Sequence, residues 1–429
     1  MEEKTFLVEM ATENAPRGRF YFANLDLPAK DYEILDAHQR ARSFTAAAGY
    51  QDVVVTRCDI LPQLTDVRLD CPTMEELNFL ASRLDGLSME EQIVLQAVFQ
   101  KHQEAGDFDE VVSMKDLINM TYGLDQVCIV GGVWNDSDLG HFVIDNEMDD
   151  DILAMPQAAV DLLDAESVGR KFRMGEGGIF INNHYVPTAA YERPEIYDGV
   201  TLPGEPELET WYAFRLKINK YELLPDEDSE QKARWISLPI HPQEAKNIAQ
   251  SLGAEQIEGS LYYEMESTIP QITADHYPNM HQFSKLNRLA EMMLDMSPDE
   301  QVKFKAVLDL EKPTNMDGIL DCAAHLDDYH MEARMDDEQS YFQEYLSRML
   351  PPEFDRGWLD SLICASEGHA LLKKLDGKVT EYGVIAGRNR SLYEMVPCRD
   401  DLILHPVKQD DNQMVDQDTE DFGMGGMQM

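Results

Sequence analysis

Leu77 to Val98 reads LNFLASRLDGLSMEEQIVLQAV, and a second copy of this stretch begins 209 residues later. Leu286 to Val307 reads LNRLAEMMLDMSPDEQVKFKAV, and nine of the 22 positions are identical without a gap. In both copies, apolar residues at helical spacing lie on either side of a Ser-x-x-Glu sequence, which is a helix-capping pattern. The repeat predicts a helical hairpin in each half and a chain that consists of one module written twice.

The composition is strongly acidic. The 429 residues include 81 Asp and Glu against 36 Lys and Arg, which gives a formal net charge of −45. Contacts with phosphates require a basic face, so this balance argues against direct nucleic-acid binding and favours a basic partner. With 43% hydrophobic residues, the chain can bury a core in each of two or more domains. The alternative is an acidic soluble protein without such a partner.

The cysteines and the N-terminal sequence are typical of a cytoplasmic protein. The six cysteines include no Cys-x-x-Cys pair, and their positions differ between the two copies, so we expect reduced thiols. The N-terminal sequence MEEKTFLVEM carries acids where a signal peptide requires basic residues and an apolar run. No apolar run approaches membrane-spanning length, so we expect no membrane partner.

The first module, residues 1–190, is expected to have three parts. These are a strand-rich part over 5–70, the helical hairpin over 73–103 and an acidic α+β part over 113–190. In the first part we expect a helix from Lys30 to Ala48, and in the second part capping boxes begin at Thr73 and Ser88. In the third part we expect helices over 114–122, 136–146 and 158–171, a strand over 127–133, and a β-hairpin over 177–186 that turns at Asn182-Asn183.

The second module, residues 211–400, repeats these parts in the same order. They are a strand-rich part over 211–275, a helical hairpin over 279–310 and an acidic α+β part over 314–400. Residues 191–210, which are rich in proline and acids, are the expected linker, and residues 401–429 are an expected acidic, disordered tail. The expected fold class is α+β, as an elongated chain of small mixed α/β and helical subdomains duplicated in tandem.

Catalytic and cofactor-binding motifs are weak throughout the chain. Gly175-Glu-Gly-Gly178 lacks the preceding strand and the following helix of a dinucleotide-binding loop, and neither a phosphate-binding loop nor a nucleophile elbow occurs. The histidine pairs His276/His281 and His325/His330 are five residues apart, which is not the spacing of a helical zinc pair. We therefore predict no catalytic residues, no cofactor and no metal, and we do not expect an enzyme.

The distribution of the acids is more informative than any motif. From Asp116 to Gly169 the sequence contains no Lys or Arg. The acids of this part are Asp116, Asp125, Asp136, Asp138, Asp145, Glu147, Asp149, Asp150, Asp151, Asp161, Asp164 and Glu166. The corresponding cluster of the second module is Asp327, Asp328, Glu332, Asp336, Asp337, Glu338 and Glu344, which Arg334 interrupts. We take these two sets as the candidate partner-binding surface.

Two interpretations of the acidic sets are open. An ordinary solvated face with an acidic loop over 147–151 is one, although such faces mix both signs because like charges at helical spacing are destabilising. A surface of one sign that imitates DNA is the other. Duplex DNA carries one charge per ~1.7 Å of axis, so several tens of carboxylates could imitate on the order of 20 base pairs. Such a surface would compete for the basic groove of a DNA-binding protein.

The module resembles the ArdA antirestriction proteins, which are DNA mimics carried by conjugative transposons and plasmids. The likeness rests on Leu77-Asn78-Phe79-Leu80 and Leu286-Asn287-Arg288-Leu289 in the hairpins, and on a closing segment after residue 169. That segment is Gly169-Arg170-Lys171-Phe172 followed by Gly178-Ile179-Phe180-Ile181-Asn182-Asn183-His184. The resemblance covers roughly residues 5–190 and 210–395. The second copy departs from the pattern, with Glu381-Tyr382-Gly383-Val384 in place of the closing motif.

The resemblance implies a non-enzymatic inhibitor. It would occupy the DNA groove of type I restriction–modification enzymes, against their specificity and methyltransferase subunits, and would protect incoming mobile DNA. Because family members form dimers, the tandem chain is expected to form either an intramolecular pseudo-dimer or a homodimer. The alternative is an acidic adaptor or scaffold that binds a basic protein without mimicking DNA. An adaptor requires an apolar hot spot, whereas a mimic requires carboxylates spaced like phosphates.

Overall fold

The computed structural model describes residues 5–14, 19–41, 52–70, 72–105, 111–204, 211–221, 229–230, 232–277 and 279–395. The expected tail over 401–429 lies outside these residues. Within them the chain is mixed α+β, with short strands in several small sheets, which confirms the predicted fold class. The chain divides into two compact units between Ala324 and His325. Among the described residues, no helix is both long enough and apolar enough to cross a membrane.

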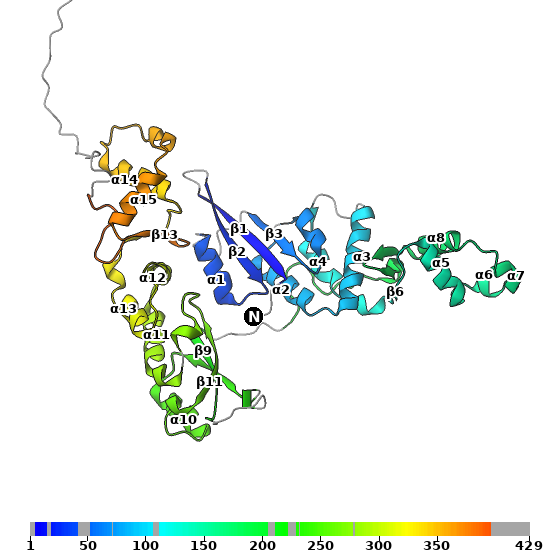
Figure 1. The fold of residues 1–429 in the computed structure, drawn as a ribbon, viewed down its shortest axis with the longest axis horizontal. Helices are drawn as coiled ribbons and strands as arrows, with labels where there is room; N and C mark the ends of the chain where they lie inside the picture. The colour runs from blue at the N-terminus through cyan, green and yellow to red at the C-terminus, as the bar shows by residue number, and fades with distance from the viewer. Residues whose placement is uncertain are drawn as a thin grey trace, which may run out of the picture. The chain divides into compact units, whose positions relative to one another are not determined.

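The first unit begins with an antiparallel sheet of order β2-β1-β3, and helix α1 lies between β2 and β3 in the chain (Figure 1). The strands are β1 (Phe6–Asn14), β2 (Arg19–Leu27) and β3 (Asp52–Cys58), and the helix is α1 (Asp31–Arg40). Phe6, Val8 and Met10 are buried, because alternate residues of a strand point to the same face of the sheet. The helix expected from Lys30 to Ala48 begins where it was predicted, and residues 42–51 lie outside the described part.

The predicted helical hairpin is formed by α2 (Met74–Asp85) and α3 (Met89–Ala105). Both predicted capping boxes are present: Thr73 Oγ1 accepts from the Glu76 amide at 3.1 Å, and Ser88 Oγ accepts from the Glu91 amide at 3.3 Å. Each glutamate in turn accepts from the amide of its capping residue, at 2.9 and 2.8 Å. Local hydrogen bonds of this kind depend on residues three apart, which is why the sequence predicts them well.

The same order of elements follows residue 211. A sheet of order β10-β9-β11 consists of β9 (Phe214–Asn219), β10 (Arg234–Leu238) and β11 (Leu261–Ser267), with α10 (Pro242–Ser251) between its last two strands. A hairpin of α11 (Phe283–Asp295) and α12 (Pro298–Glu311) follows, then α13 (Met316–Ala324). Ser297 caps α12, with Pro298 in its first turn. The two sheets have matching topology, while descent from a tandem duplication remains a prediction.

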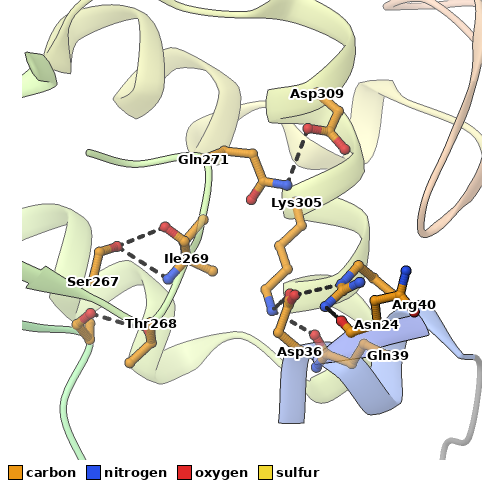
Figure 2. A network of polar contacts seen from close by, with 11 residues as sticks. Asn24, Asp36, Gln39, Arg40, Ser267, Thr268, Ile269, Gln271, Lys305 and Asp309 are labelled. Carbon is orange, nitrogen blue, oxygen red and sulfur yellow. Dashed lines mark hydrogen bonds and ion pairs between the residues drawn. The ribbon is translucent and has the colours of Figure 1, made fainter. Parts of the chain in front are cut away.

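Helix α1 contacts helix α12 through a buried polar cluster (Figure 2). Lys305 Nζ donates to Asp36 Oδ1 at 2.6 Å and to Gln39 Oε1 at 2.8 Å, and Arg40 Nε donates to Asp36 Oδ2 at 2.9 Å. Burial lowers the pKa of the Lys305 ammonium, and Asp36 partly offsets this effect. The cluster joins segments that the sequence assigns to different modules.

The acidic part of the first unit is built around two helices, α5 and α8. Its elements are α4 (Met114–Met120), β6 (Val130–Gly131), α5 (Asp136–Asp145), α6 (Asp150–Leu153), α7 (Gln157–Val160), α8 (Ala165–Glu176), β7 (Ile179–Ile181) and β8 (His184–Val186). The predicted hairpin that turns at Asn182-Asn183 is confirmed, and both turn residues have positive φ. The strand predicted over 127–133 is limited to two residues, since only Val130 and Gly131 pair with β8.

The single helix predicted over 158–171 is wrong. Helix α7 ends at Val160, and a new helix begins after Asp164, whose carboxylate accepts from the Ser167 amide at 3.1 Å. An N-cap in the middle of a helical pattern starts a new helix, because the capping residue itself has extended backbone geometry.

Part of the expected linker packs on the first unit. The Asn119 side chain accepts from the amides of Ile196 and Tyr197, at 2.9 and 2.7 Å, and donates to the Tyr197 carbonyl at 2.9 Å. Tyr197 is buried, and its hydroxyl donates to Glu76 at 2.8 Å. Residues 191–204 therefore follow the surface of helix α4, and residues 205–210 lie outside the described part.

The second unit is a smaller α+β assembly. Its strands and long helices are β12 (Met331–Glu332), α14 (Glu338–Met349), α15 (Ala365–Lys374), β13 (Lys378–Thr380) and β14 (Gly383–Ile385). The sheet order β12-β14-β13 corresponds to β6-β8-β7 of the first unit. Tyr341, Leu371 and Val384 are fully buried in its core. The closing hairpin is thus present although its sequence motif is absent.

Candidate functional site: the acidic surface of helices α5 to α8

Two glycines bring helices α5 and α8 into close contact. A Cβ atom at Gly140 would lie 1.7 Å from the carbonyl oxygen of Ala165, and one at Gly169 would lie 1.8 Å from that of Asp136. Only glycine leaves room for backbones at this separation. Leu139 and Val143 are buried in the small core beneath this crossing. The helices therefore form a firm base for the acids on α5, α6 and α8.

Three of the predicted site residues are neutralised by arginines. Asp136 receives two hydrogen bonds from Arg173, at 2.7 and 3.1 Å, and the Arg173 guanidinium lowers the pKa of this carboxyl group. Arg170 pairs with Glu166 and lies 3.7 Å from Asp136. Asp116 pairs with Arg193 at 2.9 Å. Arg170 and Arg173 follow the cation-free stretch directly, and Arg193 lies further along the chain. A stretch without cations in sequence is therefore not free of cations in space.

Three more predicted residues hold helix ends. Asp149 Oδ1 accepts from the amides of Asp151 and Ile152, at 2.9 and 3.3 Å, at the start of α6. Asp164 caps α8, and the hydroxyl and amide of Ser167 lower the pKa of its carboxyl group. Asp138 accepts from the Trp134 amide at 3.2 Å. These interactions fix the carboxylates in place without cancelling their charge.

The remaining acids of the first set are unneutralised. Within the described part of the chain, no cation pairs with the exposed side chains of Asp125, Asp145, Glu147, Asp150 and Asp151, and Asp161 accepts only from the Gln157 amide group, at 2.9 Å. Asp145 lies in the last turn of α5, where the helix dipole disfavours a negative charge. We define residues 145–151, with five acids and no cation, as the acidic turn.

The predicted residues of the second unit are mostly paired. Asp328 pairs with Arg388 at 3.0 Å, while Glu332 and Glu344 lie 3.6 and 3.1 Å from Arg348. Asp337 caps α14 and Glu338 lies 3.6 Å from His369. Asp327 is exposed and Asp336 is half-buried. The second set therefore carries less unneutralised charge than the first, which favours the first set as the candidate site.

Sequence reasoning missed a pocket between α5, α6 and α8. It has a volume of about 450 Å³, and its apolar wall is formed by Val143, Ile152, Met155, Leu163, Val168 and Phe172. Asp149, Asp151, Asp164 and Glu176 also line it, with Lys171 as the single cation in the lining. Val168 and Phe172 are four residues apart on α8, which is a helical signal. The other residues join them only in the folded protein.

Two of the histidines that the sequence singled out have structural contacts. His276 Nε2 lies 3.0 Å from the Pro313 carbonyl oxygen, and His330 Nδ1 lies 3.1 Å from the Ser391 hydroxyl. Across the described residues, no group of three or more His, Cys, Asp or Glu side chains is arranged to hold a metal ion.

No protein-family model, curated protein or solved structure matches the chain. A functional assignment therefore relies on the geometry and charge of the surface just described and on the sequence pattern.

Proposed function

We propose that this protein is a DNA mimic that inhibits type I restriction–modification enzymes by occupying the groove in which they bind DNA. The observation that carries the proposal is the acidic turn, in which five of seven consecutive residues are acids and no cation among the described residues pairs with them. Duplex DNA likewise presents one charge per ~1.7 Å of its axis to its partners. The net charge of −45 and the resemblance to antirestriction proteins support the same function.

The inhibition requires no chemistry. Lysine and arginine side chains of the enzyme would pair with the carboxylates of the acidic turn in place of phosphates, and the enzyme would then be unable to bind DNA. Asp149 is held by its contacts with the backbone of α6, so its charge is presented without a large loss of side-chain entropy. Because the attraction is between exposed charges, salt should weaken it.

The second candidate function is an acidic adaptor for a basic protein. The pocket between α5, α6 and α8 favours it, because an apolar cavity beside the carboxylates offers a hot spot that DNA lacks. An adaptor would bind its partner without displacing DNA, so competition with DNA distinguishes the two functions.

The test is DNA cleavage and methylation by type I enzymes at increasing concentrations of this protein. We expect stoichiometric inhibition at about 50 mM salt that weakens by at least roughly tenfold at about 200 mM salt. DNA added in excess should relieve it. If excess protein leaves every type I enzyme tried fully active at low salt, the proposal is wrong. If the protein binds the enzyme and excess DNA does not displace it, the adaptor function is favoured.

A variant with Asp149→Asn, Asp150→Asn and Asp151→Asn sharpens this test. Asparagine retains the oxygen that caps α6, so the fold should remain intact while inhibition weakens by about tenfold or more. The control removes the same charge from exposed positions elsewhere, with Asp66→Asn, Asp85→Asn and Glu90→Gln. Equal losses in both variants would show that total charge matters and that the acidic turn does not.

A further inference from the structure

The pocket between α5, α6 and α8 has a feature that charge imitation does not use. Its volume of about 450 Å³ lies within the range of ligand-binding pockets, and much of its lining is apolar. Two of the helices that line the pocket, α5 and α8, are in close contact at Gly140 and Gly169. The third helix, α6, contributes Ile152, whose side chain is buried. The pocket is therefore lined largely by residues of packed helices, so it can accept an apolar group without rearrangement of the backbone.

Apolar side chains continue outside the pocket on the same segment. Met148, Leu153, Leu162 and Met174 are each more than half exposed, and Leu162 is 85% exposed. Met155, which lines the pocket, is 39% exposed. Exposed apolar groups concentrated on one segment are typical of interaction sites, because they lose contact with water only when a partner covers them. A surface that imitated phosphates alone would not require them.

The charges around the pocket restrict the chemistry of its occupant. Four carboxylates and one ammonium group line it, so an acidic occupant would be repelled. Asp149 and Asp164 are fixed by their capping hydrogen bonds, and Glu176 accepts from the Tyr185 hydroxyl at 3.0 Å. An apolar side chain with lysine or arginine on either side would satisfy both the wall and these carboxylates.

We propose that this pocket binds a large apolar side chain, aromatic or aliphatic, that projects from a basic segment of a partner protein. Lysine or arginine residues beside that anchor pair with Asp149, Asp151 and Asp164. The inference deepens the proposed function, from which it takes only the basic character of the partner. It adds a contact that DNA cannot imitate, since burial of an apolar side chain persists in salt that screens the carboxylates.

Gly175 allows the pocket to be closed without disturbing the fold. It lies in α8 and lines the pocket, and a Cβ atom built there meets no other atom within 4 Å. Gly175→Phe should therefore be tolerated by the backbone and occupy the pocket. Gly175→Ala makes the same backbone change with a side chain too small to fill it, so it is the matched control.

The experiment measures binding of two fluorescein-labelled, lysine-rich peptides to the full chain by anisotropy. One peptide carries a single central tryptophan, and the other carries alanine in its place. We expect the tryptophan peptide to bind about tenfold more tightly or better, at low salt and at about 0.5 M salt. This preference should persist in Gly175→Ala and disappear in Gly175→Phe. Equal binding of the two peptides, or a preference that survives in Gly175→Phe, overturns the proposal.

Two further arms separate the alternatives. If N-acetyl-tryptophanamide alone binds as tightly as the tryptophan peptide, the pocket is a small-molecule site and the proposal is wrong. The variant Asp149→Asn, Asp150→Asn, Asp151→Asn should weaken both peptides and retain their ratio, and a ratio of one in this variant counts against the pocket. Salt-sensitive inhibition of a type I enzyme can be observed without a preference for the tryptophan peptide, and the preference can be observed without inhibition. The two proposals can therefore be refuted independently.

Discussion

Asn78 and Asn287 have the same role in the two hairpins. Asn78 Oδ1 accepts from the Ala29 amide at 2.6 Å, and its Nδ2 donates to the Ala29 carbonyl at 2.8 Å. Asn287 makes the corresponding pair with Ile240, at 2.8 and 3.2 Å. Each asparagine thus ties its helix to the residue that follows a Leu-Pro step. The presence of asparagine at both positions is explained by this shared structural role.

Replacing Asn78 should destabilise the first unit. In Asn78→Ala the nearly buried amide and carbonyl of Ala29 lose their partners, so we expect the free energy of unfolding to fall by about 1–3 kcal/mol. Urea unfolding followed by circular dichroism measures this change. Asp85→Asn, an exposed position at the end of the same helix, is the control and should change stability by less than about 0.5 kcal/mol. Similar losses in the two variants would contradict the proposed role of Asn78.

At the scale of elements, the close helix crossing recurs in the second unit. A Cβ atom at Gly368 of α15 would lie 2.0 Å from the carbonyl oxygen of Glu338 in α14. Gly169 of α8 stands in the same relation to Asp136 of α5. In both units, therefore, a glycine in the second helix lets the backbone at the start of the first helix approach it. The crossing in the first unit supports both the acidic turn and the pocket.

Two substitutions in α8 should have opposite effects. Gly169→Ala forces the backbones of α5 and α8 apart, so we expect a loss of about 1–3 kcal/mol or more and faster hydrogen exchange of the α5 and α8 amides. In Gly175→Ala the added Cβ atom points into open space, and alanine favours the helix. We therefore expect the free energy of unfolding to rise by about 0.5–1 kcal/mol. Hydrogen exchange that is unchanged in Gly169→Ala would show that the helices do not need this contact.

At the scale of the whole molecule, charge opposes folding. The chain has 81 acids and 36 basic residues, and several basic residues serve local pairs such as Arg173 with Asp136. Most carboxylates therefore repel one another at neutral pH, and this repulsion lowers the free energy of unfolding. A function that depends on a strongly negative electrostatic field would explain why the chain keeps this excess of acids despite its cost in stability.

Salt should therefore stabilise the protein while it weakens partner binding. We expect Tm to rise as sodium chloride increases from about 0.02 to about 0.5 M, by roughly 2–4 °C for each kcal/mol of repulsion that is screened. Differential scanning calorimetry measures the change. Potassium chloride should act equally, since screening does not depend on a specific ion site. A Tm that falls or stays constant over this range would rule out dominant repulsion.

Most of the local elements and their order can be predicted from the sequence, although its pattern predicts one helix where the structure has α7 and α8. Some features depend only on residues within a few positions of one another, so they can be predicted without knowledge of the fold. These are the capping boxes at Thr73, Ser88 and Ser297 and the turn at Asn182-Asn183. Which carboxylates stay unneutralised depends on contacts that form only in the folded chain. Arg173 reaches Asp136 from 37 residues away, and Lys305 reaches Asp36 from 269 residues away. The pocket likewise exists only because α5 and α8 cross at two glycines, since packing between distant segments leaves no periodic signal in the chain.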